Sequence, residues 1–411
     1  MPRFEAFRGV RYAPEVDLDA VVCPPYDVIG PEERAALVSR SPHNCVQIEL
    51  PAAEPGGDRY AEAAHLYGLW QQEGVLRRDP EPTLYVSRMT FDDEAGRRRS
   101  GLGVLGALEL GVPGQRDVLP HERTTPKPKS ERLDLQRACR ANISPVWGLS
   151  MASGLSELLA PGREPDGERL GQAVDTDGIT HDLWRLPAER NRAVSELVSR
   201  RPVVLADGHH RYETGLAYQR EVRAANGDKP GDHDLILTLV TELADDQISL
   251  RAIHRLVSGL PAGFDPLDAL GRHFELTGAG PVDPAFLHEM ERAGALGVVT
   301  PSGSWLAKPR PATEDRAEYP LDSARAAVAL GDLPEHELVY QHGVENIAAA
   351  VDKGEAQLGI LLRPATVSTI RSMAEQRLLM PPKTTFFYPK PRTGLVFRTI
   401  DLGPKDPGAR R

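Results

Sequence analysis

The hydrophobic and polar positions of the 411-residue chain follow two periods, one helical and one extended. Apolar residues at helical spacing predict helices over residues 59–73, 130–140, 188–200, 212–224 and 366–376. Alternating or short apolar runs predict strands over residues 45–50, 83–90, 101–110, 202–206 and 235–243. A Thr-Asp-Gly tip at 176–178 predicts a hairpin over 174–186. This irregular mixture, with several hairpins, predicts an α+β fold with mixed sheets and not a regular βαβ repeat.

The length of the chain exceeds what one average core supports, so two or three packed units are expected. We predict an N-terminal α/β region over residues 1–115, a central unit over 116–258, and a C-terminal α/β region over 259–411. The C-terminal region contains the proline-rich segment MPPKTTFFYPK.

Composition narrows the class of protein. Hydrophobic residues make up 40% and charged residues 26%, which is typical of a globular chain. The net charge of -10 disfavours a bulk electrostatic grip on nucleic acid, so a nucleic-acid partner is not expected. The chain contains no apolar run of the roughly 18 residues that span a membrane, and its start does not resemble a signal peptide. We therefore expect a cytoplasmic protein without a membrane partner.

The cysteines are few and do not form a motif. Cys23, Cys45 and Cys139 include no CxxC pair, so the pattern indicates neither a disulfide framework nor a zinc site. We interpret them as buried thiols and expect no resident metal site built from cysteine.

The densest chemistry lies in the turn Asp207-Gly208-His209-His210-Arg211, between an apolar strand and a helix. Glycine permits a tight turn, and the first turn of a helix offers unpaired N–H groups and a positive dipole end to an anion. The two histidines and the arginine add side-chain donors that suit phosphate. Asp207 has three possible roles: metal ligand, proton acceptor or helix cap. The simpler alternative is a capping aspartate beside surface histidines, but the concentration of donors favours an anion site.

His121-Glu122 is the second candidate. A carboxylate beside cations in a loop suits a general base, while a charged, exposed loop explains the same residues equally well. Lys127, Lys129 and Arg132 follow, and we expect them at the solvated surface although they suit phosphate as well.

The third candidate is Lys383, with Tyr388 and Lys390, in the proline-rich segment. Polar residues on a rigid loop can reach a neighbouring site, which makes Lys383 a candidate nucleotide-binding residue. The aromatic residues Phe386 and Phe387 are expected in the core. The sequence contains no P-loop, GxGxxG, HExxH or GxSxG motif, so a standard NTPase, Rossmann dehydrogenase, zincin or hydrolase is not indicated.

Five landmarks, in this order, resemble the domain of unknown function (DUF) 1015 family. They are PPYDV, LPHERT with KSERLDLQRACRANISPVWGL, LADGHHRYETGL, IHRLV, and MPPKTTFFYPK with TGLV, and they run from about Phe7 to Val396. This family name implies no activity.

A more distant resemblance does imply an activity. A strand followed by Asp-Gly-His-x-Arg and a helix is similar to the nucleotide-binding turn of the ParB/sulfiredoxin-like fold, which includes free serine kinases. This resemblance implies a ParB/sulfiredoxin-like unit over 116–258, with Glu122 activating an acceptor hydroxyl. It further implies that Gly208, His209, His210 and Arg211 hold phosphate. Asp207 and His209 join Glu122 as candidate catalytic residues.

The leading hypothesis is therefore a small-molecule kinase that uses ATP or ADP and Mg²⁺, with free serine or another small hydroxyl-bearing metabolite as acceptor. One alternative is a non-catalytic nucleotide- or nucleic-acid-binding protein. The other is a metal-dependent hydrolase with Asp207, His209 and His210 as ligands, which would need a further ligand from elsewhere.

Overall fold

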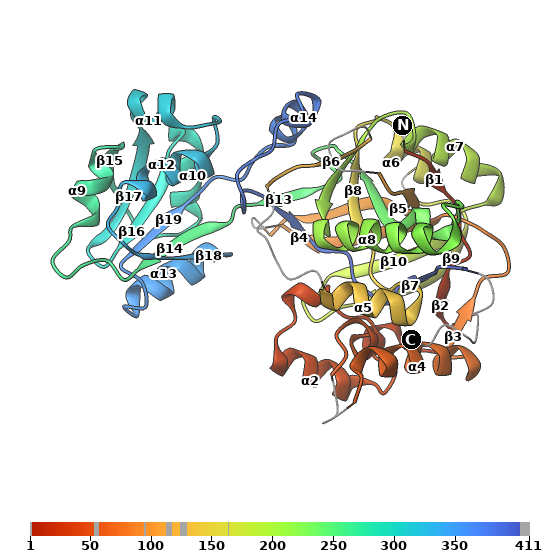
Figure 1. Cartoon of the computed structure of the whole chain (residues 1–411). Helices are drawn as coiled ribbons and strands as arrows, with labels where there is room; N and C mark the ends of the chain where they lie inside the picture. Colours follow the sequence, from red (N-terminus) through yellow and green to blue (C-terminus); the bar gives the residue numbers. More distant parts are fainter. Residues whose placement is uncertain are drawn as a thin grey trace. The chain divides into compact units, whose positions relative to one another are not determined.

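Two compact units make up the chain in a computed structural model, which describes residues 2–52, 57–93, 96–111, 117–123, 130–162 and 164–402 (Figure 1). Unit 1 comprises Met1–His121, Thr125–Ser249 and Pro389–Arg411. Unit 2 comprises Glu122–Thr124 and Leu250–Tyr388. The chain thus leaves unit 1 after residue 249 and returns to it at residue 389.

The centre of unit 1 is a mixed sheet of nine described strands. In pairing order its strands are β6 (Val118–Pro120), β11 (Val203–Asp207), β8 (Val146–Ser150), β12 (Leu235–Glu242), β5 (Arg98–Glu109), β4 (Tyr85–Asp92), β10 (Thr180–Arg185) and β9 (Glu168–Val174), with β1 (Phe4–Glu5) paired to β5. The pairs β11–β6 and β12–β8 are parallel and the others are antiparallel.

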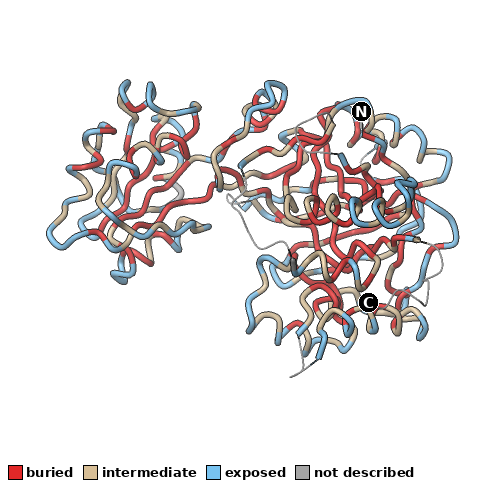
Figure 2. The backbone as a smooth tube through the Cα atoms, in the orientation of Figure 1, coloured by how far each residue is buried: buried red, intermediate tan, exposed pale blue. Residues whose placement is uncertain are grey.

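Burial across this sheet follows strand position. All eight residues of β12 are buried, as expected of an inner strand covered on both faces, whereas the edge strand β9 is largely exposed (Figure 2). The sheet explains why the chain forms two units where three consecutive regions were predicted. Strands from 1–115 lie between strands from 116–258, so the two regions share one sheet and one core.

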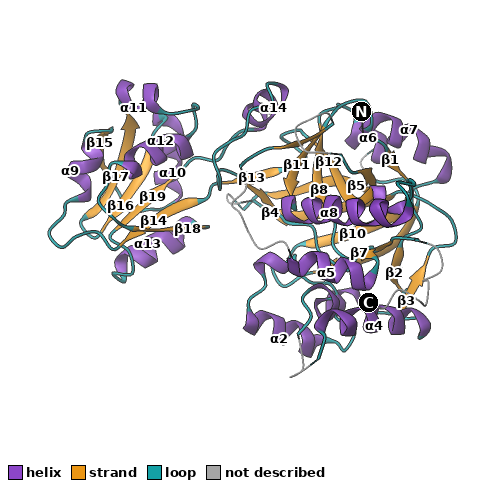
Figure 3. Cartoon of the chain, viewed as in Figure 1, coloured by secondary structure: helices purple, strands orange, loops and turns teal. Residues whose placement is uncertain are grey.

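Helices and two small sheets surround this sheet (Figure 3). The helices of unit 1 are α1 (Leu18–Val21), α2 (Pro31–Arg40), α3 (Val46–Glu49), α4 (Arg59–Gln72), α5 (Ser130–Cys139), α6 (Leu155–Leu159), α7 (Ala188–Val198) and α8 (His209–Asn226), with 3-10 turns η1 (Tyr26–Val28) and η2 (Asp232–Asp234). The small sheets pair β2 (Val10–Tyr12) with β3 (Leu76–Arg78), and β7 (Ala141–Asn142) with β21 (Arg398–Thr399). Helix α8 packs against β8, β12 and α5.

The strand predicted over 45–50 is wrong, because α3 occupies this segment. The side chain of Asn44 accepts a hydrogen bond from the Val46 N–H at 3.0 Å, and the Leu50 N–H donates to the Val46 carbonyl at 2.8 Å. An Asx turn at Asn44 therefore leads into a single helical turn, and the alternation of Val46, Gln47, Ile48 and Glu49 does not reflect an extended backbone. The other predicted strands and helices named above are present, with shifted ends.

Unit 2 contains a six-stranded antiparallel sheet and its covering helices. The strands pair in the order β15 (Phe274–Ala279), β17 (Gly303–Pro309), β16 (Leu296–Thr300), β19 (Leu358–Leu361), β14 (His254–Ser258) and β18 (Glu337–Gln341). The helices are α9 (Pro266–Gly271), α10 (Pro284–Ala293), α11 (Pro311–Arg316), α12 (Asp322–Gly331), α13 (Val344–Asp352) and α14 (Val367–Glu375). In addition, β13 (Ser249–Arg251) pairs with β20 (Phe386–Tyr388). Each unit combines a sheet with flanking helices, which confirms the α+β prediction. The sheet of unit 1 is mixed, as predicted, whereas the six-stranded sheet of unit 2 is antiparallel.

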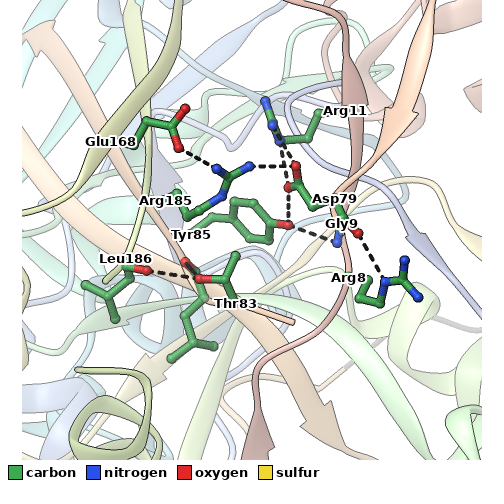
Figure 4. Close-up of polar contacts among 10 residues, drawn as sticks. Arg8, Gly9, Arg11, Asp79, Thr83, Tyr85, Glu168, Arg185 and Leu186 are labelled. Atoms are coloured by element: carbon green, nitrogen blue, oxygen red, sulfur yellow. Dashed lines mark hydrogen bonds and ion pairs between the residues drawn. The ribbon is translucent and has the colours of Figure 1, made fainter. Parts of the chain in front are cut away.

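An ion-pair cluster around Asp79 joins β2, β4 and β10 within unit 1 (Figure 4). Its carboxylate accepts two hydrogen bonds from Arg11, at 2.7 and 2.9 Å, one from Arg185 at 2.7 Å and one from the Tyr85 hydroxyl at 2.6 Å. Tyr85 in turn accepts a hydrogen bond from the Gly9 N–H at 2.9 Å. Every acceptor position of this buried carboxylate is thereby used, which fixes the N-terminal segment to the sheet.

Candidate functional site

The strand-to-helix junction of β11 and α8 is the first candidate site. Val203 to Ala206 are buried between β6 and β8. Gly208 then takes a left-handed φ of 84°, and α8 begins directly at His209. The predicted start at Tyr212 is therefore three residues late. His209, His210 and Arg211 form the first helical turn, where main-chain N–H groups lack acceptors within the helix. The junction thus has the form of an anion-binding helix start.

Asp207 is not the cap of this helix. Gly208 occupies the N-cap position and makes no side-chain cap hydrogen bond. Instead, one oxygen of Asp207 accepts a hydrogen bond from Lys390 Nζ at 2.7 Å, and the other accepts one from Arg211 Nη2 at 2.5 Å. Burial alone raises the pKa of the Asp207 carboxyl, but the charges of Lys390 and Arg211 outweigh burial and lower it. Asp207 is therefore an ionised carboxylate between two cations.

Arg211 is held in place from two sides. It is 8% exposed, and it donates to the carbonyl of Pro145 as well as to Asp207. Burial opposes its charge, yet the charges of Asp207, Asp27 and Glu49 raise its pKa above the ordinary value. A Cβ atom on Gly208 would lie 3.0 Å from Arg211 Nε. Glycine thus serves both the left-handed turn and the close approach of the guanidinium.

A pair of histidine rings lies beside the turn within unit 1. The ring centroids of His121 and His209 are 5.0 Å apart. His121 is buried, and its Nδ1 lies 2.5 Å from the carbonyl oxygen of Leu205. A carbonyl only accepts hydrogen bonds, so Nδ1 of His121 is the donor in this contact. The arrangement therefore places two imidazole rings next to the helix start.

His210 opens onto a cavity of about 300 Å³ in unit 1. Its walls come from η1, the end of α3, α4, α5 and α8, and the lining residues are Tyr26, Glu49, Leu50, Pro51, Arg59, Tyr60, Glu131, Arg132, Leu135, His210 and Thr214. Arg132, expected at the solvated surface, instead binds the fully buried carboxylate of Glu49 at 2.9 Å and stacks over Tyr26. Lys127 and Lys129 lie outside the described residues.

Glu122 and Lys383 belong to unit 2. The backbone of Glu122 forms an isolated parallel β-bridge with Met380, and the Glu122 carboxylate accepts a hydrogen bond from the Thr384 N–H at 3.3 Å. Lys383 has a left-handed φ of 58°, and its carbonyl accepts a hydrogen bond from Arg255 at 3.1 Å. The MPPKTT segment therefore anchors Glu122 through its backbone. The structure groups Asp207, Gly208, His209, His210 and Arg211 in unit 1, and Glu122 with Lys383 in unit 2.

A second cavity, of about 380 Å³, lies in unit 2. Asp322 on its wall accepts hydrogen bonds from Arg363 and Arg325, and the hydroxyls of Ser323 and Thr384 are 2.8 Å apart. Since both arginines already hold one carboxylate, the charges of this cavity are largely satisfied by one another.

Sequence reasoning singled out Lys390 only in passing and missed the cavity residues Tyr26, Glu49 and Tyr60. Lys390 reaches Asp207 across 183 positions of the chain, a contact that no local pattern reveals. Tyr26 follows two consecutive prolines in the CPPYDV motif, residues 23–28, and the rigidity that these prolines give the backbone is the one local signal for this part of the cavity. Among the described residues, no three His, Cys, Asp or Glu side chains cluster in a way suited to a metal ion.

No helix in the described part of the chain combines the length and the apolarity needed to cross a membrane.

Comparison with solved structures identifies distant neighbours. The chain is similar to a conserved hypothetical protein from Pyrococcus furiosus, with 14% identity, a TM-score of 0.35, and coverage of 68% of this chain and 90% of that one. It is also similar to a free serine kinase in complex with AMP (13% identity, TM-score 0.36, coverage 68% and 88%). A third neighbour is SbnI with a C-terminal truncation from Staphylococcus aureus (11% identity, TM-score 0.38, coverage 71% and 85%).

No curated protein matches the chain. A family model described as a protein of unknown function (DUF1015) matches residues 4–328, which include the Asp207–Arg211 turn and end before the MPPKTTFFYPK segment. The chain belongs to the DUF1015 family.

Proposed function

We propose that the β11–α8 turn binds the phosphates of ATP or ADP, and that the chain is a small-molecule kinase. The observation that carries the proposal is the placement of one carboxylate, Asp207, between two cations at a helix start. The three side chains Asp207, Lys390 and Arg211 together carry one positive charge in excess, before the helix dipole is added. A phosphate group there would accept hydrogen bonds from main-chain N–H groups of the first turn and be neutralised by Lys390 and Arg211.

In this proposal the part of unit 1 around the turn is ParB/sulfiredoxin-like. Glu122 is the general base, and it follows His121 directly in the chain. The acceptor hydroxyl oxygen attacks the terminal phosphorus, its proton passes to Glu122, and the bond from phosphorus to the nucleotide oxygen breaks. Asp207 and His209 position the phosphates, and Lys383 is a further candidate for phosphate binding. Free serine or another small hydroxyl-bearing metabolite is the proposed acceptor.

Mg²⁺ enters this proposal with the nucleotide. Magnesium is usually held by phosphate oxygens, water and one or two carboxylates, so it requires no cage of protein ligands. Asp207 is the carboxylate of the turn that fits this role, and the ion would neutralise phosphate charge. The rival hydrolase needs Asp207, His209 and His210 to share an ion, whereas among the described residues no three His, Cys, Asp or Glu side chains are grouped in a way suited to a metal ion.

The test is incubation of the full chain with serine, Mg²⁺ and ATP or ADP, followed by detection of phosphoserine. We expect turnover by the wild type and a loss of about 10² to 10⁴ in kcat for Glu122→Gln, with nucleotide binding retained. Glu275→Gln, which changes an exposed carboxylate of β15, is the matched control and should retain activity. A wild type that neither binds nucleotide nor turns over overturns the proposal.

Two outcomes would favour the rivals. Nucleotide binding without any transfer to serine or other hydroxyl compounds favours a non-catalytic nucleotide-binding protein. The residues of the proposed phosphate turn all belong to unit 1, so binding does not require Glu122 of unit 2. Tightly bound zinc or iron in the purified protein favours the metal-dependent hydrolase.

A further inference from the structure

The cavity beside His210 has walls that suit a flat, uncharged ring. Its volume of about 300 Å³ is at the lower end of the range for small-molecule sites, roughly 300 to 1,000 Å³. Two tyrosines, Tyr26 and Tyr60, line it together with the apolar residues Leu50, Pro51 and Leu135. Aromatic and aliphatic walls of this kind favour a ligand part that gains from stacking and burial.

The charged residues of the cavity are already paired with one another. Arg132 binds Glu49 at 2.9 Å, and Arg59 binds Glu131 at 2.8 Å. Glu49 also accepts a hydrogen bond from Ser144 at 2.8 Å. Because these pairs cancel, the cavity itself does not call for an ionic ligand, and a small zwitterion such as an amino acid would leave most of its apolar wall unused.

Both arginines also add planar surfaces. Arg132 lies over the Tyr26 ring at 4.1 Å from its centroid, and Arg59 lies over the Tyr60 ring at 4.8 Å. Guanidinium planes and aromatic rings are the two kinds of surface on which protein sites stack nucleobases. The cavity thus contains four such surfaces, contributed by η1, α4 and α5.

His210 connects this cavity to the proposed phosphate site. Its main chain is in the first turn of α8, and its side chain lines the cavity together with Thr214, one turn further along the same helix face. Helical side chains lean towards the N-terminus of their helix, so the cavity side of His210 and the helix start lie at the same end of α8. One ligand with a planar group and an attached phosphate therefore fits both features.

We infer that the cavity lined by Tyr26, Tyr60 and Arg132 holds the base of the nucleotide whose phosphates bind at the start of α8. This inference rests on the proposed function, because the phosphate site sets the nature of the ligand. It assigns to the CPPYDV motif a role in recognising the nucleoside, with stacking as the main source of affinity.

Binding of ADP and of inorganic pyrophosphate to the full chain, measured by calorimetry, separates the two parts of the ligand. We expect Tyr60→Ala to weaken ADP binding by about tenfold to a hundredfold, because the loss of a stacking side chain costs about 1–3 kcal/mol per base. Pyrophosphate lacks a base, so its affinity for the same variant should stay within twofold of the wild type. Tyr26→Leu, in η1, is the second variant and should behave in the same way.

Tyr340→Ala is the matched control. Tyr340 in β18 also has an arginine over its ring, Arg255 at 4.6 Å, but it does not line the cavity. Its ADP and pyrophosphate affinities should equal those of the wild type. Unchanged ADP binding in both cavity variants, with ADP bound by the wild type, overturns this inference and leaves the proposed function standing. A wild type that binds neither ligand overturns both.

Discussion

Asp79 and Asp207 are both carboxylates of unit 1 held by two cations, but they differ in how fully they are satisfied. Asp79 accepts four hydrogen bonds, from Arg11, Arg185 and Tyr85, and its side chain is 6% exposed (Figure 4). From described side chains Asp207 accepts one hydrogen bond from Lys390 and one from Arg211, and its side chain is 16% exposed. An ionised carboxylate can accept about four hydrogen bonds, so among the described residues Asp79 is saturated and Asp207 is not.

This difference in hydrogen bonding distinguishes a structural ion pair, at Asp79, from an ion pair that can accommodate a ligand, at Asp207. At Asp79 the donors and acceptors match, so a ligand could enter only by breaking the cluster. At Asp207 the carboxylate has acceptor capacity left and lies at the start of a long helix, where an anion is favoured. The presence of charged side chains thus says less about ligand binding than whether their hydrogen-bond donors and acceptors are already paired with one another.

Removal of the saturated carboxylate should have the largest effect on stability. Asp79→Ala leaves Arg11 and Arg185 without their shared partner, and breaking a buried ion pair typically costs about 3–5 kcal/mol. Urea unfolding followed by tryptophan fluorescence should therefore show a loss of about 3 kcal/mol, since Arg185 is partly exposed. Pyrophosphate binding should be unchanged. A loss below about 1 kcal/mol, or a defect in binding, would remove the distinction between the two sites.

Lowering the pH distinguishes the contribution of a buried histidine of unit 2 to stability from the contributions of the two carboxylates. Burial, aided by the charges of His342 and Arg255, lowers the pKa of His254 to about 4. Because this folded pKa lies below the unfolded value of about 6.5, the stabilisation is complete above pH 6.5 and is lost as the pH falls towards 4. At pH 5 the loss is about 2 kcal/mol relative to pH 7.

The carboxylates behave differently because the pKa values of Asp79 and Asp207 are lowered. Their stabilisation is present above about pH 4 and is lost only as the pH falls further, through their folded pKa values. Urea unfolding at pH 7 and pH 5 should therefore report on buried histidines with lowered pKa values, which include His181 and His273 beside His254, and not on the two carboxylates. His254→Gln should reduce the difference between the two pH values by about 2 kcal/mol, and an equal difference in both proteins would contradict the assignment.

Two cations two residues apart provide a closely matched test of the Asp207 turn. Lys390 binds Asp207, whereas Arg392 binds Asp175 and Asp177 at 2.6 Å each. Lys390→Met should weaken pyrophosphate binding about tenfold, which corresponds to about 1.4 kcal/mol for one charged contact. Arg392→Met should lower stability but leave binding intact. Equal effects of the two changes on pyrophosphate affinity would mean that the charge of the whole segment matters, and not the contact with Asp207.

Much of the fold follows from local pattern. Helix α4, the amphipathic helix α7, the buried strand β12 and the hairpin around Asp177-Gly178 have enough repeats of one period to be predicted. The sequence-based predictions are wrong where a single local contact or residue determines the backbone conformation. An Asx turn at Asn44 precedes α3 within a segment that alternates like a strand. After the left-handed Gly208, α8 begins at His209, three residues before the predicted start at Tyr212.

The candidate site shows the same division. The Asp207–Arg211 turn was predicted because its residues are consecutive and its strand and helix flank it. The contact of Asp207 with Lys390, and the cavity that combines Tyr26, Tyr60 and Arg132, join segments far apart in the chain. Such contacts depend on the sheet order, in which the N-terminal strands β4 and β5 lie inside the sheet, and one sequence does not specify that order.

Substitution of Gly208 should have the smallest effect. A Cβ at its φ of 84° costs about 1–2 kcal/mol, and it would also displace Arg211, whose Nε lies 3.0 Å away. Gly178 at the hairpin tip has a similar φ of 74°, but a Cβ there would meet no atom within 4 Å. Gly178→Ala and Gly208→Ala should thus lose similar stability, about 1 kcal/mol in urea unfolding. Only Gly208→Ala should weaken pyrophosphate binding, by a few-fold. If neither change affects binding, the position of Arg211 is not critical for phosphate, and the helix start and Lys390 alone would account for the site.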